Sequence, residues 1–158
     1  MEYKEILLNT AVCAIAADNV IDQREIESLK KIEKNSPYFS SIDLEQTLQS
    51  SLDTCMSDIE SFTNSTLERI TKSNLNVVQE LTLLEISLRI IAADDIITEE
   101  EEQFIIRLRT VLKLDDLIIS ERFGGIDYLG ISASDFPIDG ISFQIRVPER
   151  DTCLGSSI

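Results

Sequence analysis

The chain is 158 residues long, with 43% hydrophobic residues and a formal net charge of −15. This length is enough to bury a core, and the acidity argues against nucleic-acid binding, because phosphate contacts require a basic surface. The sequence has no histidine and no GxxxxGK or GxGxxG motif, which removes His-based catalysis and the common phosphate-binding loops and favours a non-enzymatic protein.

Two helices are predicted in the first 35 residues. Residues 3–17 have apolar residues at helical spacing and little polarity on any side, which predicts a mostly buried helix. The second helix begins after Asp22, because Asp22-x-x-Glu25 has the spacing of a capping box, in which each side chain binds a backbone N–H of the first turn. Its inward residues are Ile26, Leu29 and Ile32.

The middle of the chain is less regular. We predict a helix over about 42–58 and a short one over 65–70, which the capping box Ser65-x-x-Glu68 would open. The strongest core helix follows Asn74 or Asn76. Its predicted inward residues are Val77, Val78, Leu81, Leu84, Leu88 and Ile91.

The last two predicted helices complete an all-helical domain over residues 1–123. Thr98-x-x-Glu101 is predicted to cap the first of them, and a short helix over 116–123 ends at Gly124 and Gly125. The inward residues of the capped helix are Phe104, Ile105, Leu108 and Leu112.

Residues 124–158 form a C-terminal extension of different character. The stretch "ISFQIRV" (141–147) alternates apolar and polar residues, as a β-strand does, and the earlier "DYLGIS" is compatible with the other arm of a hairpin. A lone strand leaves its backbone unpaired, so its apolar face must pack on the helical domain or on another protein. We favour a protein partner, bound through Ile141, Phe143, Ile145 and Val147.

The cysteines and the hydropathy exclude further classes of protein. Cys13, Cys55 and Cys153 form no CxxC pair, so neither a zinc ribbon nor a redox motif is indicated, and Cys13 is expected to fill the core. No apolar run is long enough to span a bilayer, and the first residues lack the basic-then-apolar form of a signal peptide. We therefore expect a cytosolic protein that does not insert into membranes.

One phrase of the sequence occurs twice. "AADNVIDQRE" begins at residue 16 and "AADDIITEEE" at residue 92, a shift of 76 positions that pairs Asp18 with Asp94 and Glu25 with Glu101. Each copy lies between an apolar helix and an amphipathic helix. The economical interpretation is a duplicated helical hairpin, with the two copies packed face to face.

This repeated phrase resembles the TerB-like tellurite-resistance family and the related N-terminal domain of membrane-anchored DnaJ-type co-chaperones. The resemblance covers roughly residues 3–115 and implies an all-α bundle of about six to seven helices, built from two repeated helical hairpins. Family members typically have Asp-Gly after the alanines, whereas this sequence has Asn19 and Asp95 at the glycine positions, and both residue types tolerate a left-handed backbone. The family is linked to stress-response and phage-defence gene clusters, so the resemblance implies that this chain acts as a scaffold or a sensor.

The resemblance also implies a set of candidate metal ligands, because acidic residues of that family have been suggested to bind metal. The matching residues are Asp18, Asp22, Glu25, Asp94 and Glu101. An EF-hand is excluded, since its first and third ligand positions would be Ala14 and Ala16. Carboxylates shared between the two copies would still be able to hold Ca²⁺ or Mg²⁺ weakly. We prefer the interpretation that these residues cap helices and fix turns.

These observations support two main hypotheses about function. The leading one is a non-catalytic acidic adaptor, without a cofactor, in a cytosolic multiprotein complex of stress response or phage defence. The alternative is a sensor that responds to Ca²⁺ or another divalent metal through carboxylates of both repeats. An enzyme with a carboxylate-only site is a third and weaker hypothesis.

Overall fold

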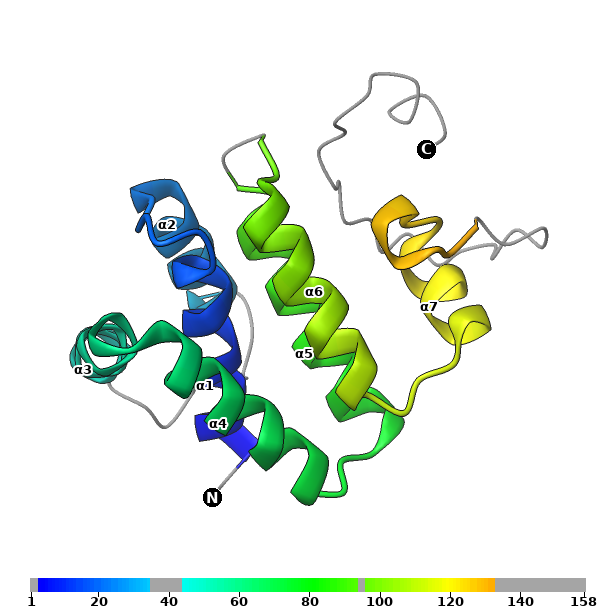
Figure 1. Ribbon diagram of the computed structural model, residues 1–158, viewed down its shortest axis with the longest axis horizontal. Helices are drawn as coiled ribbons and strands as arrows, with labels where there is room; N and C mark the ends of the chain where they lie inside the picture. Colours follow the sequence, from blue (N-terminus) through cyan, green and yellow to red (C-terminus); the bar gives the residue numbers. More distant parts are fainter. Residues whose placement is uncertain (1–2, 35–43, 94–95, 133–158) are drawn as a thin grey trace.

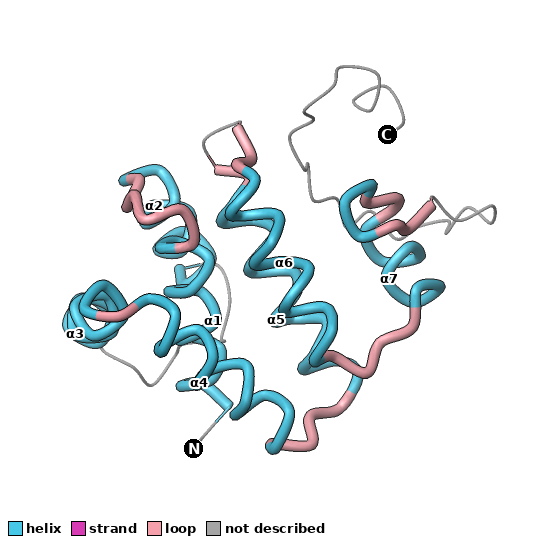
Figure 2. Tube along the Cα trace, viewed as in Figure 1, coloured by secondary structure: helices cyan, strands magenta, loops and turns pink. Residues whose placement is uncertain are grey.

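The computed structural model describes residues 3–34, 44–93 and 96–132, and these ranges contain helices and loops but no strand (Figures 1 and 2). The helices are α1 (Tyr3–Ala16), α2 (Gln23–Lys34), α3 (Leu44–Ser57), α4 (Ile59–Lys72), α5 (Val77–Ile91), α6 (Glu99–Val111) and α7 (Asp116–Phe123), followed by the 3₁₀ turn η2 (Asp127–Leu129). The predicted all-α class is confirmed for the described residues. None of their helices is both long and apolar enough to cross a membrane.

Helix α1 lies at the centre of the bundle. Nearly every side chain from Ile6 to Ala16 is buried, and the helix packs against α3, α4 and α5. Ala11 and Ala14 have no exposed surface, and their small side chains let the surrounding helices approach closely. The expectation of a mostly buried first helix is confirmed.

Helices α1 and α5 run side by side in the same direction. The hydroxyl of Tyr3, at the start of α1, donates a 2.7 Å hydrogen bond to the carbonyl oxygen of Gln79, near the start of α5. Because the two helices have 14 and 15 residues, they also end at the same level. The turns that follow them therefore lie at one end of the bundle, the top of Figure 1. Helix α2 packs on α5, and α6 packs on both α1 and α5.

The fourth helix is longer than the sequence pattern predicted. Helix α4 begins at Ile59, and its N-cap is Asp58, whose carboxylate accepts a 3.1 Å hydrogen bond from the backbone N–H of Ser61. Ser65 and Glu68 lie exposed inside this helix, so the predicted capping box is wrong. Residues three apart share one face of any helix, and a polar S-x-x-E pair therefore also occurs in the middle of one.

The start of α5 also differs from its prediction. Val77 and Val78 are 50% and 71% exposed rather than inward. Asn76 forms a capping box with Gln79, which places both valines in the first turn, at the end of the bundle opposite the repeated turns. The deeper predicted core residues Leu84, Leu88 and Ile91 are buried, as are Phe104, Ile105, Leu108 and Leu112.

The chain beyond α7 stays packed on the helical body as far as Ile131. Gly124 and Gly130 adopt positive φ angles of 81° and 69°, and Ile126 and Ile131 form an antiparallel bridge on either side of η2. Both isoleucines are buried, and η2 packs against α6. The segment "DYLGI" is therefore a tight turn rather than a hairpin arm. Residues 141–147, with the predicted strand, lie outside the described residues.

The predicted capping box of α6 is confirmed. Its effect on stability can be compared with that of Ser65, where the capping-box prediction is wrong. Thr98 Oγ1 accepts from Glu101 N–H at 3.1 Å, and Glu101 Oε1 accepts from Thr98 N–H at 2.9 Å. Thr98→Ala should lower the free energy of unfolding by about 1 kcal/mol. The control Ser65→Ala should cost nothing, because alanine favours a helix interior. Denaturant unfolding measures both, and a larger loss for Ser65→Ala would contradict this assignment of caps.

Candidate functional site

The first repeated turn uses its aspartate to hold the backbone. Asp18 Oδ1 accepts a 3.0 Å hydrogen bond from the N–H of Val20, and the N–H of Asn19 donates to the carbonyl of Ala16 at 3.0 Å. Asn19 has a φ of 67°, so it occupies the left-handed region, as expected for a residue that replaces glycine. Asp18 therefore stabilises the turn locally.

Asp22 is engaged at the start of α2. Its Oδ1 accepts from the backbone N–H of Arg24 at 2.8 Å, and the guanidinium of Arg24 contacts both carboxylate oxygens at 3.3 and 3.2 Å. Hydrogen bonds from the Arg24 side chain and then from its backbone lower the pKa of Asp22. This carboxylate thus caps α2 through Arg24. The predicted capping box with Glu25 is wrong, because Asp22 accepts from Arg24 and the Glu25 carboxylate accepts no hydrogen bond from Asp22.

The two glutamates at matching repeat positions are both buried. Glu25 lies in the first turn of α2 and Glu101 in the first turn of α6, where Glu101 completes the capping box with Thr98. The remaining candidate ligand, Asp94, lies outside the described residues. Among the described residues, no group of three acidic or cysteine side chains is placed to hold a metal ion. Asp18, Asp22 and Glu101 thus bind separate backbone groups, Glu25 is a buried carboxylate in α2, and a site shared through Asp94 stays a prediction.

A buried phenol lies beside the first turn of α6. The hydroxyl of Tyr128, in η2, is inaccessible to solvent and has no hydrogen-bond partner among the described residues. Burial raises the pKa of Tyr128, and the nearby carboxylates of Glu102 and Glu101 raise it further. Both glutamates are themselves buried. The sequence does not predict this cluster, because nothing in the local pattern places η2 against α6.

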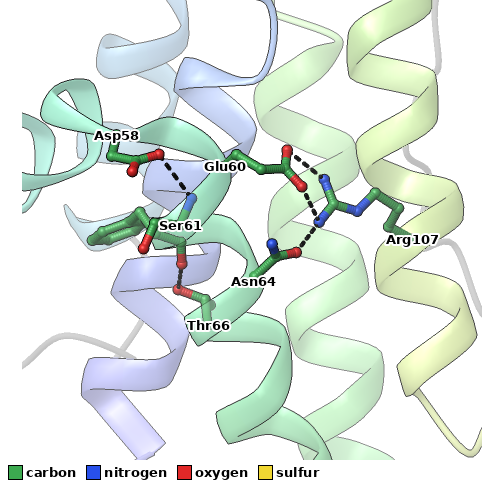
Figure 3. Close-up of polar contacts among 7 residues, drawn as sticks. Asp58, Glu60, Ser61, Asn64, Thr66 and Arg107 are labelled. Carbon is green, nitrogen blue, oxygen red and sulfur yellow. Dashed lines mark hydrogen bonds and ion pairs between the residues drawn. The ribbon is translucent and has the colours of Figure 1, made fainter.

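Figure 3 shows a polar link between α4 and α6. The guanidinium of Arg107 donates to both carboxylate oxygens of Glu60, at 3.4 and 3.3 Å, and to the side-chain oxygen of Asn64. Asp58 caps the start of the same helix α4, through Ser61. Arg107 and Glu60 are partly exposed to solvent, so their ion pair contributes at most about 1 kcal/mol. This link is structural, since it holds two helices together at the surface.

The two described cysteines are poorly suited to act as nucleophiles. Cys13 and Cys55 are free and buried. Burial raises the pKa of Cys13 to about 12, against the opposing effect of hydrogen bonds with Thr63 and Thr66. Burial also raises the pKa of Cys55 to about 11. Because the thiolate is the reactive form, both thiols are inert at neutral pH, and Cys13 fills the core as predicted.

Glu85 joins α5 to α7. It accepts from Arg122 of α7 at 3.0 Å and forms an ion pair with Arg89 one turn along α5 at 3.1 Å. Burial raises the pKa of Glu85, while the charges of Arg89 and Arg122 oppose that change. Glu85 therefore acts as a structural link between α5 and α7.

An open groove of about 500 Å³ runs between α2 and α3. Its apolar lining comes from Ile26, Leu48 and Leu52, and its polar lining from three glutamines and Lys30. The segment 35–43, which joins the two helices, lies outside the described residues. These lining residues suit an apolar group and include neither a carboxylate nor a thiol.

The repeated turns instead expose apolar side chains. Val20 is 61% exposed and Ile96 is 66% exposed, and the two residues occupy the same position in the two copies of the phrase. The sequence pairs them, but it does not show that both are exposed or that both turns lie at one end of the bundle. This end is the candidate interaction surface of the helical body.

Comparison with known proteins gives no assignment. No family model, no curated protein and no solved structure matches this chain. The resemblance to the TerB-like family therefore depends on the repeated phrase alone.

Replacing Tyr128 with phenylalanine should change stability in a pH-dependent way. Its raised pKa means that the folded state disfavours the phenolate, so this contribution to stability is full below the ordinary pKa of 10 and is lost as pH rises through the folded value. Between about pH 9 and 11, the melting temperature of Tyr128→Phe should therefore fall less than that of the unsubstituted chain, as thermal melts at each pH would show.

At neutral pH the same variant should be as stable as the unsubstituted chain or more stable, because an unpaired buried hydroxyl is unfavourable. The matched control is Tyr3→Phe, which removes the hydrogen bond to Gln79 and should cost about 1 kcal/mol. If Tyr128→Phe is the more damaging of the two, the Tyr128 hydroxyl has a partner, such as a bound water.

Proposed function

We propose that this chain is a non-catalytic acidic adaptor of the TerB-like type, which acts within a cytosolic multiprotein complex of stress response or phage defence. The observation that carries the proposal is how the side chains of the repeated phrase are placed in the structure. Its described carboxylates bind backbone groups or are buried, while Val20 and Ile96 are exposed at equivalent positions. Exposed apolar side chains beside carboxylates that are already hydrogen-bonded or buried favour protein binding over metal or substrate chemistry.

The arrangement of the helices supports the TerB-like part of this proposal. Under this proposal, α1–α2 and α5–α6 are two copies of one helical hairpin, related by an approximate twofold axis. The first helices of the two hairpins pack on each other, and each second helix contacts the first helix of the other hairpin. Tyr3 and Gln79, which hydrogen bond, are separated by 76 positions, the same shift that relates the two phrases.

The C-terminal extension supplies the second partner-binding element of the proposal. Ile141, Phe143, Ile145 and Val147 alternate along 141–147, the pattern of a strand that adds to the edge of a partner's sheet. The helical body has an extensive core over the described residues without this segment. A partner is therefore able to use it without opening that core.

Affinity purification from the native host tests the adaptor proposal. The tagged chain with Phe143→Asp and Ile145→Asp should lose its specific partner. The control with Ser142→Asp and Gln144→Asp adds the same charge on the opposite face of the strand and should keep that partner. Loss from both variants, or from neither, would argue against recognition by an alternating strand. A truncation should follow Ser132 rather than Gly125, because Ile126 and Ile131 are buried.

Thermal melts with added Ca²⁺ or Mg²⁺ test the metal-sensor alternative. If the carboxylates serve only as caps and in turns, millimolar cation should change the melting temperatures of the unsubstituted chain and of Asp18→Asn by the same amount. That equal change would come from general salt effects alone. A stabilisation that disappears in both Asp18→Asn and Glu101→Gln would instead establish the metal site and overturn the preference for caps.

A further inference from the structure

The end of the bundle with the two repeated turns leaves apolar surface uncovered. Val20, Ile21 and Ile96 are 61%, 39% and 66% exposed, and they are three of the seven large exposed hydrophobic residues of the described part of the chain. They come from turns that follow two adjacent parallel helices, whose axes lie about 10 Å apart. Covering such side chains is favourable, because it removes apolar surface from water.

The chain leaves its described body at the same end. Tyr128 lies close to Glu101 and Glu102 in the first turn of α6, only a few residues after Ile96. Ile131 is buried beside it, and residues 133–158 follow directly after Ser132. The extension is thus tethered next to the exposed apolar side chains and not to the opposite end, where Val77 and Val78 are exposed.

We propose that segment 141–147 of the same chain docks on Val20, Ile21 and Ile96 and covers them. From Ser132 to Phe143 the chain spans up to about 36 Å, more than three times the separation of about 10 Å between packed helix axes. Tethering gives the segment an effective concentration of about 1 mM, so a weak contact is enough to hold it. Its alternating apolar residues Ile141, Phe143, Ile145 and Val147 supply one apolar face that matches the exposed side chains.

This inference concerns the segment proposed above to bind a partner, and it adds regulation: the partner must displace the segment from its own body, and the displacement uncovers Val20 and Ile96. That consequence rests on the proposed function. The docking itself does not, because it is measured on the purified chain alone, so either proposal can fail without the other.

Paramagnetic relaxation in the full chain tests the docking. A nitroxide reagent attached under native conditions labels Cys153, since Cys13 and Cys55 are buried, and mass spectrometry confirms a single label. The label should cause loss of the amide signals of Val20, Ile21 and Ile96 and spare those of Val77 and Val78. Phe143→Asp should restore the lost signals, whereas Ser142→Asp, on the opposite face of the strand, should not.

The same spectra contain the results that would overturn the inference. These are no loss of signal at either end of the bundle, equal loss at both ends, or loss that persists in Phe143→Asp. A mixture of nitroxide-labelled chain with separately isotope-labelled chain must show no loss. Loss in that mixture would assign the docked segment to a second copy and refute docking within one chain. Melting curves of each variant verify that its helical body is folded.

Discussion

The parallel contact between α1 and α5 is the constraint on which the rest of the structure depends. Both helices are apolar on nearly all sides, so each needs neighbours around its whole circumference. They meet each other, and the remaining sides are covered by α3 and α4 on α1, by α2 on α5, and by α6 on both. Alanines with no exposed surface let these helices approach, and the Tyr3–Gln79 hydrogen bond fixes their register.

This contact also determines where the polar groups of the repeat lie. Because α1 and α5 are parallel, the two turns that follow them reach the same end of the bundle, and each turn leads into a capped helix. The first turn of α6 then brings Glu101 and Glu102 under η2, where Tyr128 is buried against them. Burial of a polar group is unfavourable unless it is paired, so the buried Tyr128 hydroxyl is destabilising here.

Surface charges join the helices but do not hold the core. Arg107 connects α6 to α4, Arg122 connects α7 to α5, and Arg109 pairs with Asp116 at the start of α7. The pairs of Arg107 and Arg109 are exposed and contribute little individually, because water screens them, whereas Glu85 in the pair with Arg122 is buried. The large negative charge of the chain therefore adds little to the stability of the fold, which apolar burial supports.

The sequence by itself determined the features that depend on neighbouring residues. Helical periodicity predicted the all-α class and the buried faces of α1 and α6, and the capping box of Thr98 and Glu101 was recognisable because a cap involves residues only two or three apart. Asp22 was recognised as a cap, although it accepts from Arg24 and forms no box with Glu25. The same local logic failed at Ser65, where the spacing falls inside α4, and at Val77, which precedes the part of α5 that other helices cover. Only the tertiary structure decided that α1 and α5 are parallel, that Val20 and Ile96 are exposed at one end, and that Tyr128 is buried beside Glu101. These features arise from contacts between segments far apart in the chain, and no local pattern encodes the direction in which two apolar helices pack.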